Sequence, residues 1–445
     1  MDRVEATCRL RGGIKHSYNE QLPGKITAML SPEQNERITR TGPETSLGKG
    51  VRRYWVPALV ADQLPEAGGD PVRVTLFNED FVLFRAGDGT LGMLDEHCRH
   101  RGASLVLGRV EDCGIRCIYH GWKFAADGTV LETPNVADPN FKTRFKARSY
   151  PIRQAGGLAW VYLGPEGKEP PFPHWPWFDV PAGNIIATSH FIGCNFVQVL
   201  EGLVDSSHLG ILHSNALGVS SGSDLNYAQK VSTMQFDKAP TLETQATEFG
   251  FRYAAIRKID DRESARITSF VAPFTVVNPN GDVVTIVVPA RDDLSIFFHV
   301  FWNETQPLGE EPMRSAHLRF IGLDPDSLDR IGVRAPADPR APSASNHFHQ
   351  DRGAMHSGRS FSGLPGLIAE DVIVSVASGP LRDRSAERLS VADVAVSQLY
   401  RTIQTVADAG DAGTEPPGVA VDPQRDGARG YDLHDIAEVN WRETA

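Results

Sequence analysis

The sequence predicts an α+β protein with at least two domains. First, its 445 residues exceed what a single hydrophobic core usually serves. Second, from about residue 72 the segments RVTLF, DFVLFRA and TLGML alternate β-branched and aromatic residues around the turn-forming NED and GDG, which is typical of antiparallel strands. Third, the later part of the chain mixes strand-like segments such as GFRYAAIRK with helical ones. This combination favours the α+β class.

Five segments are expected in order along the chain. Residues 1–30 show no periodicity and are predicted to be a poorly structured extension. Residues 31–50 begin with SPEQ, where a serine N-cap, a proline and a glutamine predict an N-terminal helix. The first domain covers residues 51–165 and ends at a proline-rich stretch that excludes helix interiors and central strands. The second domain covers residues 166–410, and residues 411–445 have a linker-like composition, which predicts a tail that runs over the surface.

The composition excludes several functional classes. No apolar run approaches the ~18 residues that a membrane span needs, and the net charge of −11 argues against a nucleic-acid partner. The N-terminus has no apolar signal region, so we expect the protein to be cytoplasmic. Three of the five cysteines (Cys98, Cys113 and Cys117) lie close together, which indicates metal binding in a reducing compartment rather than a disulfide framework.

A first metal site is predicted in CRHRGASLVLGRVEDCGIRCIYHGW, residues 98–122. Cys98 and His100 form C-x-H, and after sixteen intervening residues Cys117 and His120 form C-x-x-H. Zinc sites usually group cysteine with cysteine and histidine with histidine, whereas here each loop supplies one of each. This alternation fits a binuclear iron–sulfur cluster in which the cysteines bind one iron and the histidines bind the other.

The stretch resembles the Rieske [2Fe-2S] motif, and HRGASL, GRVED and CIYHGWKF resemble the Rieske domain of aromatic-ring oxygenases. The resemblance implies a Rieske cluster held by Cys98, His100, Cys117 and His120. A Rieske domain accounts only for residues 51–165, so a plain electron carrier leaves most of the chain unexplained.

A second metal site is predicted in NFVQVLEGLVDSSHLGILHS, which contains Asp205, His208 and His213. On a continuous helix Asp205 and His208 would share a face, but His213 would be rotated away from them. A break at Gly210 would let both imidazoles converge. Two histidines and one carboxylate make the facial triad of non-heme Fe(II) oxygenases.

This second motif is similar to the catalytic-domain motif of Rieske non-heme iron oxygenases, which implies that His208 and His213 bind a mononuclear iron. The region from QDRGAMH to SGPLRDRS resembles the C-terminal region of the phthalate dioxygenase-like subfamily, in which an acidic residue ahead of SGPLRDRS is the third ligand. The resemblance assigns that role to Asp371, with Glu370 as the alternative. It also implies that Asp205 is catalytic: it links His208 of its own chain to His120 of a neighbour in a homotrimer. The alternative for Asp205 is an ordinary helix carboxylate or cap.

The resemblance implies a Rieske domain of antiparallel strands and an α+β catalytic domain with a curved antiparallel sheet covered by helices. It also implies the terminal oxygenase component of an aromatic-catabolic system. Such a component uses O2, a Rieske [2Fe-2S] cluster and mononuclear Fe(II), and electrons come from NAD(P)H through a separate reductase with flavin and a plant-type [2Fe-2S] centre, or through a ferredoxin. The chain has no G-x-G-x-x-G fingerprint, so we expect no nicotinamide site of its own.

The main prediction for the reaction is ring cis-dihydroxylation of a small aromatic carboxylate. Aryl-ether O-demethylation of a methoxylated aromatic acid is the alternative reaction, and a Rieske electron carrier or a zinc-binding interaction module are the alternative classes. A carboxylate substrate favours a bidentate cation in the pocket. Arg257 is the candidate, because it shares one strand face with Phe251 and Tyr253.

Overall fold

The computed structural model describes residues 30–215, 237–259, 262–280, 282–436 and 439–444. The predicted extension, residues 1–30, lies outside this part of the chain except for Leu30, which is buried. Across the described ranges, no helix combines the length and the apolar character that a membrane crossing requires.

Two short helices form the start of the described chain, α1 (Pro32–Thr39) and α2 (Ser46–Val51). The prediction of one helix over residues 31–50 is wrong in this respect, although the capping box at Ser31 and Gln34 is present. The chain leaves the helix at Arg40, whose backbone is extended, and Thr45 caps the second helix with its side chain. The intervening Pro43 disfavours helical backbone in the residue before it, which separates the two helices.

The N-terminal domain consists of three small antiparallel sheets. The first sheet pairs strands that are distant in sequence, in the order β1 (Trp55–Val60), β10 (Leu158–Tyr162) and β9 (Ile152–Ala155). The second has the order β2 (Val72–Leu76), β3 (Glu79–Arg85) and β4 (Leu91–Asp95). The third has the order β5 (Arg109–Glu111), β6 (Gly114–Arg116), β7 (Lys123–Phe124) and β8 (Val130–Glu132). The end of the domain around β5 and β8 has a small core of its own, which includes Cys98, Cys117 and Trp122.

An eight-stranded antiparallel sheet forms the centre of the C-terminal domain. Its strands follow the order β11 (Ile185–Ile192), β17 (Leu294–Trp302), β16 (Val283–Arg291), β15 (Thr275–Val277), β14 (Arg262–Val271), β13 (Gly250–Ile259) and β12 (Thr241–Thr247), and β18 (Tyr431–His434) also pairs with β14. This arrangement agrees with the predicted α+β class.

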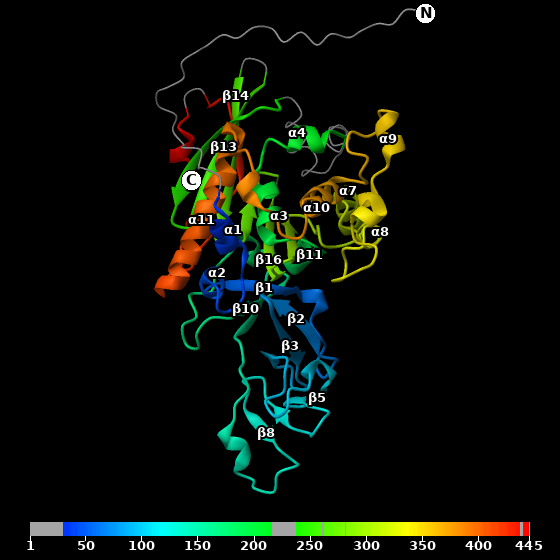
Figure 1. The fold of residues 1–445 in the computed structure, drawn as a ribbon, viewed down its shortest axis with the longest axis vertical. Helices are drawn as coiled ribbons and strands as arrows, with labels where there is room; N and C mark the ends of the chain where they lie inside the picture. Colours follow the sequence, from blue (N-terminus) through cyan, green and yellow to red (C-terminus); the bar gives the residue numbers. More distant parts are fainter. Residues whose placement is uncertain (1–29, 216–236, 260–261, 281, 437–438, 445) are drawn as a thin grey trace, which may run out of the picture.

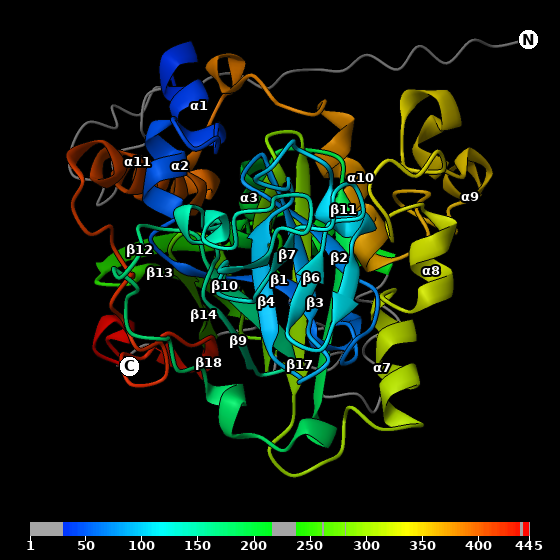
Figure 2. The ribbon, with the colours of Figure 1, turned by 90° about the horizontal axis from the view of Figure 1, so that it is seen from below.

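Helices pack against this sheet and against each other. The long helix α11 (Val394–Ala412) lies beside α1 and α2, as Figure 2 shows, and it also contacts α3 (Phe196–Val204). The helix α10 (Leu367–Ala377) packs against α3 as well. The other α-helices of the described residues are α4 (Leu209–Leu212), α7 (Met313–Ile321), α8 (Pro325–Arg330) and α9 (Arg352–His356). The site described below lies between α3, α4, α10 and the sheet.

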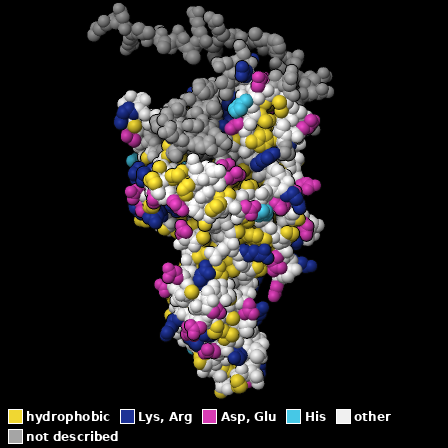
Figure 3. All heavy atoms as spheres, turned by 180° about the vertical axis from the view of Figure 1, so that it is seen from behind, with side chains coloured by type: hydrophobic (Ala, Val, Ile, Leu, Met, Phe, Trp, Pro, Cys, Tyr) yellow, Lys and Arg dark blue, Asp and Glu magenta, His cyan; other side chains and the backbone are white. Residues whose placement is uncertain are grey.

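The two domains share one hydrophobic core, which contains buried residues from both sides of the predicted boundary. The proline-rich connection between β10 and β11 is itself packed, because Trp175 and Trp177 are buried. On the face in Figure 3, acidic and basic side chains are interspersed from the narrow end to the broad end of the molecule. No large field of one sign is visible on that face.

The predicted surface tail, residues 411–445, is integrated into the fold in its described part. Here the prediction from composition is wrong: β18 pairs with β14, and Trp441 is buried. Arg252, which is also buried, donates hydrogen bonds to the carbonyls of Arg442 and Thr444. These contacts join the end of the chain to β13.

Candidate functional site

Two similar tight loops present the four residues of the first site. Cys98 and His100 follow β4, and Cys117 and His120 lie between β6 and β7. In each loop the cysteine N–H donates to a carbonyl five residues ahead, 2.9 Å away for Cys98 and 2.8 Å for Cys117. In each loop a glycine N–H then donates back to the cysteine carbonyl. Those glycines, at 102 and 121, have φ of 71° and 76°, a left-handed backbone that glycine adopts without steric cost.

These loops bring two thiols and two imidazoles to one end of the N-terminal domain's smaller core, which contains Cys98 and Cys117. Cys98 and Cys117 are both buried and unpaired by disulfide. Burial, together with the neighbouring Cys117 thiol, raises the pKa of Cys98 to about 11. The rings of His100 and His120 have centroids 4.5 Å apart, and His100 stacks on Trp122 at 4.8 Å. Nδ1 of His120 is buried and makes no hydrogen bond to the described residues, so it is available to bind a metal.

The arrangement of these donors helps to distinguish a binuclear cluster from a single zinc ion. Among the described residues, only His208, His213 and Asp371 bring three ligand atoms within 4.8 Å of one another. A tetrahedral zinc site would hold its donors at least that close, because zinc–ligand bonds are about 2.0–2.3 Å long. The four residues of the first loops, with one cysteine and one histidine in each loop, fit the ligand pattern of a binuclear iron–sulfur cluster.

The second site is formed where α3 ends and α4 begins. Asp205 is the C-cap of α3 and has extended backbone, with φ −90° and ψ 107°. His208 and His213 flank the single turn of α4 as its N-cap and C-cap. The break in the helix therefore lies before His208, and the predicted break at Gly210 is wrong. The prediction that the two imidazoles converge is consistent with their ring centroids, which are 5.1 Å apart.

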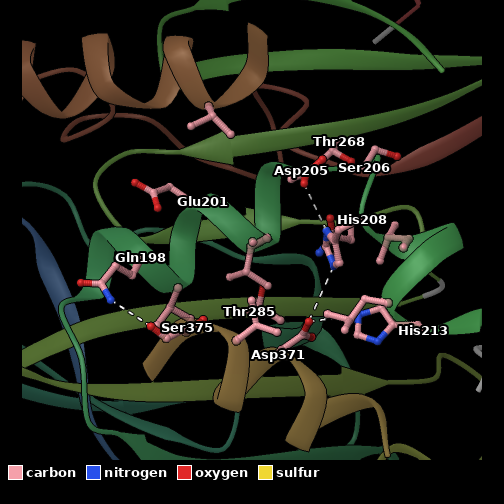
Figure 4. A pocket seen from close by; sticks show the side chains of 18 of the residues that line it. Gln198, Glu201, Asp205, Ser206, His208, His213, Thr268, Thr285, Asp371 and Ser375 are labelled. Atoms are coloured by element: carbon pink, nitrogen blue, oxygen red, sulfur yellow. Dashed lines mark hydrogen bonds and ion pairs between the residues drawn. The ribbon is translucent and has the colours of Figure 1, made fainter. Parts of the chain in front are cut away.

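Asp371, in the middle of α10, lies against both imidazoles (Figure 4). Its Oδ1 is 3.0 Å from Nε2 of His213 and 3.6 Å from Nε2 of His208. Nε2 of His213 is buried and makes no hydrogen bond of good geometry to the described residues. A buried nitrogen in that state, beside a second imidazole and a carboxylate, fits the donor set of a mononuclear iron.

The electrostatics also favour a cation between these three groups. Burial opposes ionisation of Asp371, but the two histidines outweigh it and lower the pKa of the carboxyl. Burial likewise opposes the charge on the histidines, but the adjacent carboxylates raise the pKa of His208 to about 9 and that of His213 to about 10. Protons held in this way are the ones that a bound metal ion displaces.

Two further carboxylates lie on the outer, Nδ1 sides of the imidazoles. Glu370 is buried; its Oε2 lies 2.7 Å from Nδ1 of His213, and its Oε1 accepts a hydrogen bond of 2.5 Å from Ser362. Oδ2 of Asp205 lies 3.6 Å from Nδ1 of His208. Both histidines therefore present Nε2 to Asp371. Glu370, the alternative ligand from sequence, lies behind His213 and not between the histidines, and no signal in the sequence pointed to Ser362.

A cavity of about 430 Å³ adjoins the three candidate ligands. It lies between the sheet and the helices α3, α4 and α10, and much of its wall is apolar, including Leu203, Leu209, Tyr253, Phe297, Phe301 and Ile368. This volume suits a small aromatic molecule.

Arg257, the predicted substrate anchor, is not among the described residues that line this cavity. It is buried and donates hydrogen bonds to the carbonyl and hydroxyl of Ser206, at 2.8 and 3.0 Å, and to the carbonyl of Asp237. Burial lowers its pKa to about 10. The alternation along β13 correctly placed Arg257 on the same buried face as Phe251 and Tyr253. Arg257 lies further along that strand, however, under the loop that contains Ser206. There it binds Ser206, the residue next to Asp205.

Three other arginines line the cavity, and the sequence did not single them out. Arg266 pairs with Asp432 at 3.2 Å and donates to Asn280. Arg382 pairs with Glu201 and Glu387. Arg388 donates to carbonyls of its own segment, those of Ala386 and Glu387.

Glu201 is the centre of a buried polar network beside the cavity. It accepts hydrogen bonds from Arg384 at 2.5 Å, from Tyr400 at 2.7 Å and from Arg382. Arg384 also donates to Asn35 at 3.0 Å, so the network joins α1, α3, α11 and the SGPLRDRS segment. The segment that resembled a family motif therefore has a structural function here.

Two family models match the chain. The model described as the Rieske [2Fe-2S] domain matches residues 54–151, and the one described as LigXa C-terminal domain like matches residues 161–443. Together they cover both domains and both candidate metal centres.

Characterised relatives match over most of their length. The phthalate 4,5-dioxygenase oxygenase subunit of Pseudomonas putida is 34% identical over 431 residues, which cover 93% of this chain and 94% of that protein. The 3-chlorobenzoate-3,4-dioxygenase oxygenase subunit of Comamonas testosteroni is 32% identical and covers 88% and 92%. The 5,5'-dehydrodivanillate O-demethylase oxygenase subunit of Sphingobium sp. (strain NBRC 103272 / SYK-6) is 28% identical and covers 89% and 84%.

Solved structures share the fold. A mutant of NdmA from Pseudomonas putida CBB5, solved with theobromine, has a TM-score of 0.57 at 18% identity and covers 83% of this chain and 94% of that one. Dicamba monooxygenase bound to dicamba has a TM-score of 0.54 at 16% identity and covers 81% and 99%.

Proposed function

This chain belongs to the Rieske non-heme iron oxygenases as an oxygenase subunit, and from that premise we propose that it hydroxylates a small aromatic acid and works as a homotrimer. Its cofactors are a Rieske [2Fe-2S] cluster and a mononuclear iron, O2 is its cosubstrate, and a reductase or ferredoxin supplies its electrons. When bound, the cluster supplies electrons singly and the mononuclear iron supplies O2 activation.

Seven side chains are proposed to hold these groups. Cys98, Cys117, His100 and His120 would hold the cluster, and His208, His213 and Asp371 the mononuclear iron. Glu370 and Asp205 orient the two iron histidines from behind, since each carboxylate lies on the Nδ1 side of one ring. The apolar cavity wall excludes water from the reacting face of the substrate.

The observation that carries the proposal is the convergence of His208, His213 and Asp371 at the edge of a cavity of about 430 Å³. The names of two relatives, acting on phthalate and 3-chlorobenzoate, support an aromatic acid and ring dihydroxylation. O-demethylation is the second candidate. The observation that favours it is a relative named as an O-demethylase oxygenase subunit.

Product analysis tests the reaction. The oxygenase, with both metal centres loaded and a reductase added, is offered phthalate, 3-chlorobenzoate and 3-methoxybenzoate. We expect O2-dependent product from at least one of these acids. A cis-diol would identify ring dihydroxylation, and formaldehyde would identify O-demethylation. A fully loaded enzyme that consumes no substrate from the panel would contradict the proposed substrate class.

The homotrimer is proposed from the position of the two centres. In Figure 1 the loops near β5 and β8 lie at the narrow end of the molecule, and α4 and α10 lie in its broad part, far from that end. Around the cluster residues, Leu107, Ile118 and Tyr119 are more than half exposed, and exposed apolar groups of this kind mark protein interfaces. A head-to-tail ring would bring the cluster end of one chain to the iron site of the next. Asp205, with its carboxylate 24% exposed, would then lie between His208 and the neighbour's cluster.

Asp205→Asn tests this bridge. We expect both metal centres and the trimer to persist, and a chemically reduced cluster to be reoxidised by O2 and substrate at least ~10-fold more slowly, because the amide no longer accepts as strongly from either imidazole. Stopped-flow absorbance of the cluster measures the rate. Asp179→Asn is the matched control, because the Asp179 carboxylate also lies beside a histidine, 3.0 Å from Nε2 of His174, but on the surface. Normal reoxidation in Asp205→Asn would contradict the bridging role.

We also propose the cytoplasm as the compartment. Cys113, which is not a proposed cluster ligand, is an exposed unpaired thiol, and a reducing compartment maintains such a thiol.

A further inference from the structure

A second pair of histidines lies on the sheet beside the cavity and has no part in the mechanism above. His190 on β11 and His299 on β17 are 1% and 4% exposed. In the ladder between these strands, His190 is opposite Phe297, and His299 is two residues further along β17 on the same face. Their Nε2 atoms are 3.2 Å apart. His299 lines the cavity, as Asp371 does.

The contact between the two rings requires one donor and one acceptor. Burial lowers the pKa of His190 to about 4 and that of His299 well below its ordinary value, so both rings are neutral near pH 7. A neutral imidazole carries one N–H and one bare nitrogen. Either His190 donates from Nε2 and His299 carries its hydrogen on Nδ1, or the reverse holds.

The surroundings of His190 decide between these arrangements. Its Nδ1 is fully buried and makes no hydrogen bond of good geometry to any described residue. If His190 carried its hydrogen there, an N–H would be buried without an acceptor, the rarest kind of unsatisfied group in folded proteins. His190 therefore donates from Nε2, and His299 carries its hydrogen on Nδ1. The hydrogen bond of His299 to a described residue is made at Nε2, and His299 lines the cavity, so Nδ1 is left to bind a molecule in the cavity.

We propose that His299 is a specificity-determining residue, which donates a hydrogen bond from Nδ1 to an oxygen of the substrate in the cavity while His190 fixes its tautomer. The proposal rests on the function proposed above and adds to it the kind of group that is recognised. The donor is uncharged, and Phe297 and Phe301 flank it on the same strand face at ring-centroid distances of 4.0 and 6.2 Å. An aromatic substrate that carries an oxygen acceptor, whether a carboxylate, carbonyl or ether, would match both the uncharged N–H donor of His299 and the two flanking phenylalanine rings.

Two uncharged ligands of nearly the same shape test whether His299 donates a hydrogen bond to a bound molecule. Acetophenone has a carbonyl oxygen where α-methylstyrene has a methylene group, so the ratio of their Kd values reports the oxygen and not the ring. Titration calorimetry on the oxidised holoenzyme measures both values without turnover. We expect His299→Phe to reduce the relative preference for acetophenone by about 3- to 10-fold, the value of one hydrogen bond. We expect His299→Gln, which keeps an N–H, to retain part of it, and His190→Phe to give an intermediate loss.

His317→Phe is the control, because it removes another buried neutral histidine, on α7, that does not line the cavity. Its Kd ratio should equal that of the wild type. Equal changes for both probes in His299→Phe, or equal behaviour of the Phe and Gln variants, would overturn the proposal. Failure of the wild type to bind either probe would overturn the proposed aromatic cavity and this inference together. Binding as expected with no turnover of the acid panel would overturn only the proposed substrate class.

Discussion

Replacing Asp371 with alanine is expected to remove the mononuclear iron and to abolish product formation while the visible spectrum of the cluster stays unchanged. Asp371 is the carboxylate whose Oδ1 lies 3.0 and 3.6 Å from the two imidazoles. Without it, two neutral nitrogen donors remain, and the charge that balances a divalent cation is lost. The cluster lies in a different domain with different ligands, so it should be unaffected. Iron content per chain, by mass spectrometry, and absorbance of the cluster measure the two centres separately.

Glu370→Gln is the matched comparison, because it changes the adjacent carboxylate. Glu370 lies on the far side of His213 and is 2% exposed. We expect iron affinity to fall by about 10- to 100-fold, the usual effect of losing a group that orients a metal-binding histidine. Excess iron should restore occupancy in Glu370→Gln but not in Asp371→Ala. The reverse pattern would show that Glu370 is the ligand and Asp371 the supporting group.

Replacing Arg384 with methionine is expected to lower the free energy of unfolding by about 3–5 kcal/mol, because it removes the fully buried cation beside the Glu201 carboxylate and leaves only the partly exposed Arg382. Arg384 is fully buried and bonds to both Glu201 and Asn35. The opposing carboxylate outweighs burial and keeps the pKa of Arg384 above its ordinary value. Urea unfolding followed by circular dichroism measures the loss.

Two further variants test whether the loss of stability in Arg384→Met comes from an unpaired buried charge or from lost packing. Arg382→Met should cost less, because the Arg382 side chain is 34% exposed and Glu201 keeps Arg384. The double variant Arg384→Met with Glu201→Leu should recover part of the stability, since no uncompensated carboxylate remains. If the double variant is as unstable as the sum of the two single ones, the network is not stabilised by charge pairing.

Much of the two metal centres could be predicted because their residues are close together in the sequence. Cys98 and His100 occupy one tight loop, and Cys117 and His120 occupy another. Their spacing in the sequence was therefore enough to predict a candidate metal site. Asp371 was predicted only through resemblance, and the neighbouring Glu370 competed with it. Consecutive residues on a helix point about 100° apart, so only the packing of α10 decides which of the two carboxylates faces the histidines.

The sequence was insufficient where a function depends on the position of a residue along an element. Alternation placed Arg257 on the correct face of β13, but the loop at Ser206 covers that end of the strand. The pairing of β18 with β14 gives the described end of the chain a place in the sheet that its composition did not predict. Contacts between residues far apart in sequence determine both outcomes.

By itself, the sequence predicted the class of this protein, the four candidate cluster residues and the two candidate iron histidines, because these residues lie in short motifs with characteristic spacing that resemble those of a known family. The tertiary structure alone decided that Asp371 faces the histidines, that Glu370 supports one of them, and that His190 and His299 meet beside the cavity. The physical reason is that these contacts join strands and helices more than a hundred residues apart, and the packing of the sheet against α3 and α10 sets their distances.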